Sequence, residues 1–282
     1  MHFVDLREKK EIEGTLFPFE HHHVSTSHPR YVMNYHWHSE IELVLIKKGT
    51  LHMTLNENKV EANAGDLVFI NGGVLHSGNP ENCLYECLLF DLSVFSRLSP
   101  ACEPYIKKIA NRSALVYQHF TADKDDVLSI ITPVFDSMRK PSEGYEMAVI
   151  GGLYQFFSLV FANHLYLESE PHKSQKSIQN VSRLRAVVDY MDENYSGEVT
   201  LAQLAEAASM SPRYFCRFFQ KMTDSTPIDY LNRLRIERAC YELTGSDNTV
   251  TDVAMRCGFN DLSYFIKTFK KYTGTTPGKY HR

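Results

Sequence analysis

The sequence predicts an α+β protein of two domains, a β-rich N-terminal domain and an all-α C-terminal domain with two helix-turn-helix motifs. Three observations support this: short apolar segments separated by turn residues before position 91, helical periodicity after position 181, and an internal repeat near the C-terminus. We therefore expect four parts: a β-barrel or sandwich over 1–98, a helical segment over 99–168, a linker over 169–180, and the helical domain over 181–282.

The first part contains four segments rich in Val, Ile, Leu and Phe: Ile41–Lys47, Leu51–Asn56, Asp66–Asn71 and Leu84–Asp91. Residues that favour turns separate them, namely Gly49, Asn56–Asn58, Gly65 and Gly72–Gly73. Short strands at this spacing are typical of a sandwich or a small barrel.

Helical patterns follow in Asp123–Arg139 and Ser142–Leu167, separated by Pro141. The stretch Met147–Leu167 carries no Asp, Glu, Lys or Arg, so its length permits a membrane span, but polar residues within it and the lack of flanking basic clusters favour a helix buried by protein. Its apolar side is the expected self-association face: Leu153, Phe156, Phe157, Val160 and Phe161. The polar segment Glu168–Asn180 then indicates a linker.

Composition is that of a soluble globular protein, with 43% hydrophobic and 23% charged residues. The net charge of −4 is unevenly divided: residues 1–180 carry 16 basic and 22 acidic side chains (−6), which leaves 14 and 12 (+2) for residues 181–282. The six cysteines form no CxxC pair, and no signal peptide is evident, which favours the cytoplasm. The mildly basic second half permits a nucleic-acid partner.

The repeat aligns Tyr214–Thr223 with Tyr264–Thr273 at an offset of 50, and upstream segments at an offset of 49. Each copy predicts a helix, a short turn and a second helix, over about 200–222 and 249–272. Thr200 and Thr249 are expected to cap the first helices, Ser211 and Asp261 the second, and Gly258 to permit a positive φ in its turn.

The second helix of each copy has an apolar stripe and a polar, cationic side, as a DNA recognition helix requires. The outward sides are Arg213, Cys216, Arg217 and Gln220 in the first copy, and Ser263, Lys267, Lys270 and Lys271 in the second. Arginine can pair with the guanine edge, and lysines can neutralise phosphates. A helical interaction domain with solvated charges is the alternative; the matched duplication favours double-stranded DNA.

The second copy and the residues after it resemble the signature of the AraC/XylS regulators, and the resemblance covers about Leu184–Arg282. The matching residues are Gly258-Phe259, Ser263-Tyr264-Phe265, Lys267, Phe269-Lys270, Gly274, Thr276-Pro277 and Tyr280 to Arg282. The resemblance implies base contacts from positions Arg213, Cys216 and Arg217, and from Leu262, Ser263 and Lys267. It also implies a regulator, more often an activator, that forms a homodimer, binds a small-molecule effector such as a sugar, and contacts RNA polymerase.

In the first domain His36, His38 and Glu42, followed by His76, resemble the two motifs of the cupin barrel. This resemblance implies a possible divalent metal on these four side chains, which period-two strand geometry would place on one side. The alternative is a metal-free effector pocket, to which Tyr35 and Trp37 could add aromatic faces. A metal-dependent cupin enzyme and a non-sensing dimerisation scaffold are further alternatives; no nucleophile motif or phosphate loop supports catalysis. The run His21–His23 is expected to be loop or strand edge.

Overall fold

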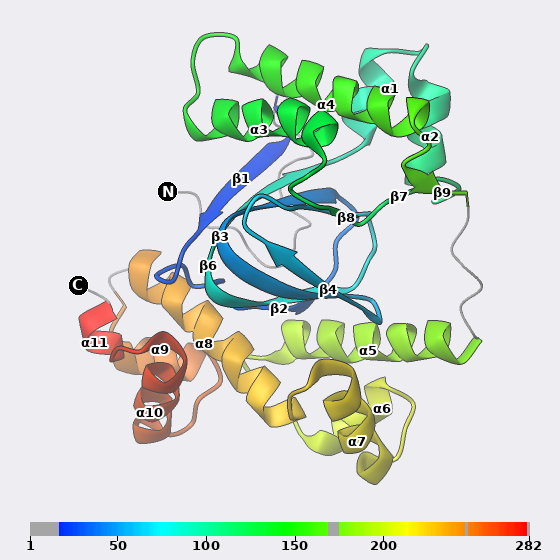
Figure 1. Ribbon diagram of the computed structural model, residues 1–282. Coiled ribbons are helices and arrows are strands. Elements are labelled where there is room, and N and C mark those ends of the chain that lie inside the picture. Colours follow the sequence, from blue (N-terminus) through cyan, green and yellow to red (C-terminus); the bar gives the residue numbers. More distant parts are fainter. Residues whose placement is uncertain (1–16, 169–174, 246–247, 281–282) are drawn as a thin grey trace. The chain divides into compact units, whose positions relative to one another are not determined.

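The computed structural model describes residues 17–168, 175–245 and 248–280 (Figure 1). Contacts between Cα atoms divide the chain into two units. We call the first the barrel unit, which contains residues 17–26 and 37–168 of the described chain. The second, the helical unit, contains Ser27–His36 together with the described residues from Gln175 onward. The observed architecture confirms the predicted fold class: a β-rich N-terminal part and an all-α C-terminal part with two helix-turn-helix motifs.

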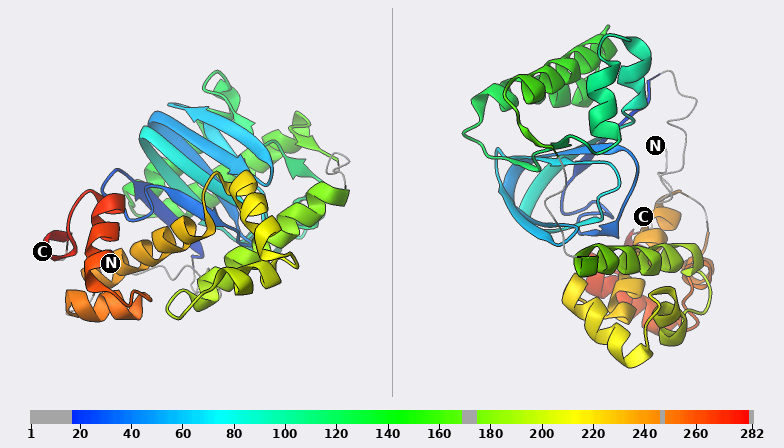
Figure 2. Two further views of the ribbon diagram at one scale, coloured as in Figure 1. Left: turned by 90° about the horizontal axis from the view of Figure 1, so that it is seen from below. Right: turned by 90° about the vertical axis from the view of Figure 1, so that its right-hand side faces the viewer.

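The barrel unit is built on an antiparallel sheet in the order β1-β6-β3-β5-β8, with β4 paired to β3. It is rolled into an open barrel, as the two views of Figure 2 show. The strands are β1 Phe19–Val24, β3 Ile41–Leu55, β4 Asn58–Asn63, β5 Leu67–Ile70, β6 His76–Phe90 and β8 His119–Phe120. A separate pair joins β7 Leu115–Val116 to β9 Tyr166–Leu167.

The expectation of two strands separated at Gly49 is wrong, because β3 runs through this position with irregular register on either side of Lys48. Gly49 has φ +71, and a Cβ there would lie 2.3 Å from the carbonyl oxygen of Asn82. A bulge therefore replaces the expected turn, since glycine allows the backbone to bend without ending the strand.

Four helices cover one end of the barrel: α1 Ser93–Leu98, α2 Glu103–Ala110, α3 Asp125–Arg139 and α4 Tyr145–Ala162 (Figure 1). By length and composition alone, α4 could cross a membrane. Four of its side chains on the apolar side are instead buried in the core with α3 and the sheet: Leu153, Phe156, Phe157 and Val160. The predicted self-association face is therefore wrong for four of its five residues, which already pack inside their own chain, while Phe161 is only partly buried.

The helical unit contains α5 Gln175–Asn194, α6 Leu201–Ala207, α7 Pro212–Thr223, α8 Pro227–Gly245, α9 Val250–Arg256, α10 Leu262–Thr273 and α11 Pro277–Tyr280. Since α5 begins at Gln175, the linker predicted over 169–180 is wrong for its second half, and residues 169–174 lie outside the described residues. Helix pairs α6–α7 and α9–α10 occupy the two repeat copies, and α8 joins them.

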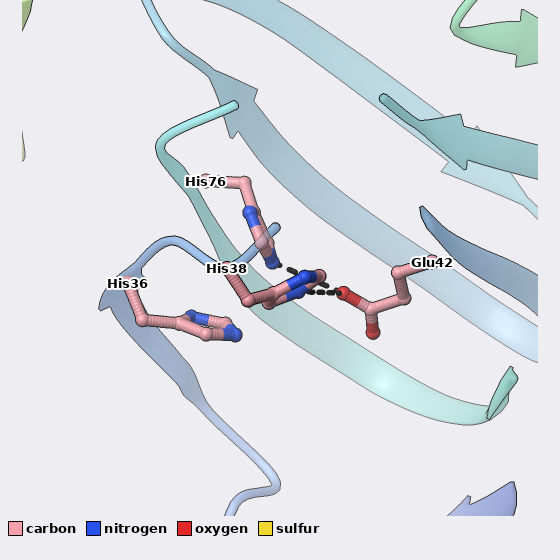
Figure 3. Close-up of side chains that lie close together, drawn as sticks. All are labelled: His36, His38, Glu42 and His76. Atoms are coloured by element: carbon pink, nitrogen blue, oxygen red, sulfur yellow. Dashed lines mark hydrogen bonds and ion pairs between the residues drawn. The ribbon is translucent and has the colours of Figure 1, made fainter. Parts of the chain in front are cut away.

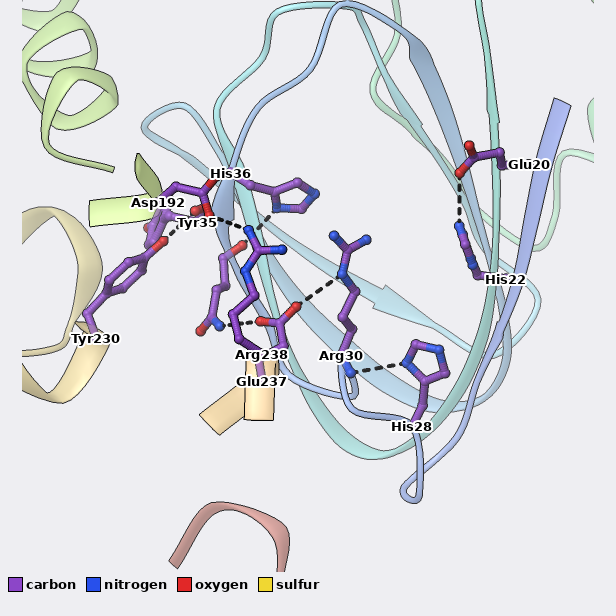
Figure 4. A network of polar contacts seen from close by, with 11 residues as sticks. Glu20, His22, His28, Arg30, Tyr35, His36, Asp192, Tyr230, Glu237 and Arg238 are labelled. Carbon is purple, nitrogen blue, oxygen red and sulfur yellow. Dashed lines mark hydrogen bonds and ion pairs between the residues drawn. The ribbon is translucent and has the colours of Figure 1, made fainter. Parts of the chain in front are cut away.

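The short segment Ser27–His36, which includes β2 Met33–His36, is held against α8 by polar contacts (Figure 4). The buried carboxylate of Glu237 accepts hydrogen bonds from Arg30 Nε at 3.1 Å and from Asn34 Nδ2 at 2.8 Å. The Tyr35 hydroxyl donates to the Met222 carbonyl at 2.8 Å, and the Tyr230 hydroxyl donates to the Tyr35 carbonyl. The segment is therefore attached to the helix that joins the two motifs.

Candidate functional site

The two helix-turn-helix motifs begin with matching caps. The hydroxyl of Thr200 accepts from the backbone N–H of Gln203, and that of Thr249 accepts from Asp252. The Asp261 carboxylate caps α10 through the N–H of Tyr264. Ser211 stands at the N-cap of α7 without a side-chain hydrogen bond to the helix, so its predicted capping bond is wrong. Three of the four predicted caps are therefore present.

The turns within the motifs both use a left-handed residue, Ser209 with φ +53 in the first and Gly258 with φ +80 in the second. The second helices end in the same way, at Asp224 with φ +53 and at Gly274 with φ +74. Asp224 thus adopts the geometry that the glycine provides in the other copy. The duplication is visible in backbone conformation as well as in residue type.

Each recognition helix buries its apolar stripe and exposes its cationic side. Phe215 and Phe219 are buried in α7, as are Phe265 and Phe269 in α10. The predicted DNA-facing residues on the exposed surface are Arg213, Arg217, Gln220, Ser263, Lys267, Lys270 and Lys271, whereas Cys216 and Leu262 are half-buried. Arg217 and Lys267 are thus both exposed at equivalent positions of the repeat.

Lys271 differs from the other predicted DNA contacts because an intramolecular acid already binds it. Its Nζ lies 2.6 Å from Oδ1 of Asp229 on α8, and the Tyr272 hydroxyl donates to the same oxygen at 2.7 Å. This arrangement favours a role for Lys271 in packing α10 against α8 over a role in neutralising phosphate. Sequence reasoning missed Asp229, which gives no signal without knowledge of the tertiary contact.

The predicted metal or pocket residues His36, His38, Glu42 and His76 come together (Figure 3), and their ligand atoms all lie within 4.8 Å of one another. Glu42 Oε2 lies 3.3 Å from Nε2 of His38 and 3.0 Å from Nε2 of His76. These three residues belong to the barrel unit and are buried. His36 is the last residue of the segment assigned to the helical unit, with only Trp37 between it and His38.

We expected one strand to carry His36, His38 and Glu42, but the three residues do not lie on a single strand. His36 ends β2, His38 lies in the connection before β3, and Glu42 is the second residue of β3. The Gly72–Gly73 turn brings the His38 connection close to His76: Gly73 N–H donates to the His38 carbonyl at 2.7 Å, and a Cβ on Gly72 would lie 2.2 Å from the Ser39 carbonyl oxygen. Glycine is required here for close backbone approach.

All three imidazoles are oriented by the same kind of bond. Nδ1 of His36, His38 and His76 lies 2.9, 3.1 and 2.8 Å from the backbone carbonyls of Asn34, Glu40 and Val74, respectively. A carbonyl only accepts, so each Nδ1 carries the proton and Nε2 is the atom available to the cluster. Backbone carbonyls fix the ring of metal-bound histidines in this way. The residues fit a divalent cation.

The ionisation of Glu42 depends on the two buried histidines beside it. Burial alone would raise the pKa of Glu42, but hydrogen bonds and positive charge from His38 and His76 outweigh burial and hold its pKa well below the ordinary value. With both Nδ1 atoms protonated, neutral rings would direct Nε2 lone pairs at the carboxylate. The contacts therefore require a positive species between them, either protons on Nε2 or a cation.

The two aromatic residues expected near this cluster differ in exposure. Tyr35 is buried, and its hydroxyl is bonded to Met222 of the helical unit. Its hydroxyl is thus engaged within the helical unit, and the place of Tyr35 in an effector pocket stays a prediction. Trp37 adjoins His36 and His38 in the chain and is 40% exposed. Trp37 is thus the more exposed of the two side chains, and its place in an effector pocket also stays a prediction.

A barrel with a buried ligand cluster, followed by two helix-turn-helix motifs, defines a transcriptional regulator with a ligand-binding domain. The model of the AraC-like ligand-binding domain matches residues 21–105, and that of a helix-turn-helix domain matches residues 204–282. The chain belongs to the AraC family of transcriptional regulators. Its helix-turn-helix domain binds DNA, and its ligand-binding domain implies a small-molecule effector.

Curated relatives match most of the chain. The uncharacterized HTH-type transcriptional regulator YdeC of Bacillus subtilis (strain 168) is 28% identical over 88% of this chain and 85% of that protein. The melibiose operon regulatory protein of Escherichia coli (strain K12) is 24% identical over 90% of this chain and 85% of its own length. The HTH-type transcriptional activator RhaS of Salmonella paratyphi B is 23% identical over 86% of this chain and 85% of its own length.

Proposed function

We propose that the chain is an effector-responsive activator in the cytoplasm that binds two neighbouring major-groove segments of one operator with α7 and α10. The observation that carries this mode is the exposure of Arg217 and Lys267 at equivalent positions of two motifs built alike. Successive major-groove faces are about 34 Å apart, a distance that one chain with two linked motifs can span. Contact with RNA polymerase and self-association belong to this proposal, the latter through a surface other than the buried side of α4.

The base-reading role of α7 predicts a specific effect for Arg217→Ala. Loss of a bidentate contact to guanine should reduce discrimination at one operator position by about 1–3 kcal/mol, while other positions are unaffected. Lys270→Ala is the matched change on α10, since a phosphate contact should weaken binding to all duplexes evenly and flatten its salt dependence. Both effects are measured by fluorescence anisotropy with operator and random duplexes at several salt concentrations. Two variants that bind like the parent would contradict this assignment of the outward faces.

We further propose that the barrel senses its effector through a divalent metal held by His38, Glu42 and His76, with His36 as the fourth ligand. Three imidazoles and one carboxylate suit Zn, Ni, Mn or Fe and leave coordination positions open. When bound, the metal supplies a Lewis-acidic centre for the oxygen atoms of an effector. A melibiose operon regulator among the relatives supports a sugar, whose hydroxyls are such oxygen donors.

We expect about one divalent ion per chain in the parent. The double variant His38→Ala, His76→Ala should lose most of this metal, because it lacks half of the donors of the site. Elemental analysis of the purified full chain after dialysis measures this. His52→Ala is the matched control, since His52 is an exposed histidine of β3 that faces Glu61 and Glu81. Equal metal content in parent and double variant, including none in either, would contradict the metal proposal.

A route from this site to DNA is part of the proposal. His36 ends the segment whose Arg30 and Asn34 bind Glu237 on α8. A metal or effector that binds His36 better in one position of this segment shifts the equilibrium toward that position. Since α8 joins the two recognition motifs, the change is passed to the part of the chain that contacts the operator.

A further inference from the structure

Helix α8 carries a polar row, Asp229, Asn232 and Arg235, that faces the second helix-turn-helix motif. A spacing of three residues places these side chains on one side of the helix. Asp229 accepts from Lys271 and Tyr272, and Asn232 Nδ2 donates to the Tyr264 hydroxyl at 2.8 Å. The row therefore attaches α10 to the helix that comes from the first motif.

Arg235 differs from its two neighbours because it contacts both the turn of the second motif and the connection that leads into the first. Its Nε donates to the Tyr195 carbonyl and its Nη2 to the Gly197 carbonyl, each at 2.8 Å, in the connection that leads into α6 of the first motif. Its guanidinium also lies over the ring of Phe259, 5.7 Å from the centroid, in the turn of the second motif. A planar fork with several donors can make these contacts at once, whereas an ammonium group cannot.

At Gly258 the turn of the second motif closely approaches both Tyr195 and Arg235. A Cβ on Gly258 would lie 2.3 Å from the Tyr195 carbonyl oxygen and 2.9 Å from Arg235 Nε. The turn of the second motif thus lies directly against the backbone that precedes the first. Such close contact resists rotation of one motif against the other, since a small displacement brings atoms into overlap.

We propose that Arg235 is a positioning residue that fixes the separation of α7 and α10, and thereby selects the distance between the two half-sites of an operator. The inference rests on the proposed binding of both recognition helices to one duplex. DNA over one or two turns behaves as a stiff rod, so a rigid pair of helices accepts one spacing and is penalised at others. With a loose joint, the second helix binds at a lower effective concentration but tolerates several spacings.

The test begins with an operator selected from a random duplex library by the full-length parent, with protection of the duplex used to define its footprint. Duplexes are then made with the half-site spacing changed by one or two base pairs, and one duplex keeps only the half-site of α7. We expect the parent to prefer one spacing by about tenfold or more over a one-base-pair change. Arg235→Ala should bind the preferred spacing about tenfold more weakly and flatten the preference to about threefold, with binding to the single half-site unchanged.

Two further variants separate positioning from charge and from folding. Arg235→Lys keeps the positive charge but loses the planar guanidinium, so it should also flatten the spacing preference. If Arg235→Ala does not fold, this variant provides the test of the positioning role. Arg256→Ala removes an equal charge from an exposed side chain of α9 and should keep the parent's preference. A footprint with two half-sites and an unchanged preference in the Arg235 variants would overturn this inference alone. A parent footprint with a single half-site would overturn the two-helix mode and this inference with it.

Discussion

Replacement of Gly258 with alanine is expected to unfold the second helix-turn-helix motif and to abolish operator binding. Gly258 has φ +80, where an L side chain costs about 1–3 kcal/mol, and the added Cβ would lie 2.3 Å from the Tyr195 carbonyl. Relief of that overlap adds a further cost of about 1–3 kcal/mol. A total of about 4 kcal/mol is a large part of the stability of an ordinary domain. Urea denaturation followed by circular dichroism, together with operator binding, measures both effects.

Gly274→Ala provides a matched control for this prediction. Gly274 has a similar φ of +74 at the end of α10, but a Cβ there would have no neighbour within 4 Å. The substitution should therefore cost only the backbone strain, about 1 kcal/mol, and preserve DNA binding. Similar losses for both variants would show that the left-handed backbone alone, and not the contact with Tyr195, makes Gly258 necessary.

The helical half could be predicted in detail because its determinants are local. Thr200, Thr249 and Asp261 cap helices through backbone groups three residues away, and Gly258 lies in a turn defined by its neighbours. The internal repeat added a second test of each position. What could not be predicted were contacts between distant segments, such as that of Lys271 with Asp229, because residue spacing says nothing about them.

In the first half of the chain, fewer features could be predicted, because more of them depend on contacts between distant segments. The expected turn at Gly49 is a bulge inside β3, and β4 was not predicted, because short strands pair with partners that periodicity does not identify. The apolar side of α4 was correctly expected to be buried by protein but was also expected to face a second copy. Apolar periodicity indicates which side of a helix is buried, but it does not indicate whether the same chain or a second copy buries it.

The His–Glu cluster was found from residue types at a familiar spacing, although the expected backbone was wrong. His38 lies outside a regular strand, and its approach to His76 depends on the Gly72–Gly73 turn. The hydrogen-bond partners of Tyr35 were missed for a related reason: strand alternation does not reveal that the segment before His36 is attached to α8. The residue types at the site were thus predictable, and the connections that orient them were not.

The run His21–His23, expected to be loop or strand edge, lies in β1 at the end of the strand order, and His21 and His23 contact the buried carboxylate of Glu86. Glu86 on β6 accepts from Arg139 Nε at 2.7 Å and Nη2 at 3.1 Å. His23 Nδ1 lies 3.1 Å from the same carboxylate and His21 Nε2 lies 3.9 Å from it. Strand alternation places His21 and His23 on the Glu86 side and His22 beside Glu20 on the other.

Glu86→Gln is expected to lower the free energy of unfolding of the barrel unit by about 3 kcal/mol at neutral pH. Removal of one partner from a buried ion pair typically costs about 3–5 kcal/mol, and the lower end applies because Arg139 is one-third exposed and also binds Asp136. Asp136→Asn is the matched control: its exposed carboxylate contacts the same arginine, so its loss should cost less than about 1 kcal/mol.

The same substitution should change how stability depends on pH. Burial alone raises the pKa of Glu86, but hydrogen bonds from His21, Arg139 and His23, with the charge of Arg139, outweigh burial and hold the pKa below its ordinary value. A carboxyl group with a lowered pKa in the folded state contributes stability that is fully present above its unfolded pKa of about 4.3, and lost as the pH falls through the lowered value. The stability difference between parent and Glu86→Gln should therefore be constant from about pH 7 to pH 5 and narrow below about pH 4. A difference that persists unchanged in acid would show that the Glu86 carboxylate is not what holds β6 to α3.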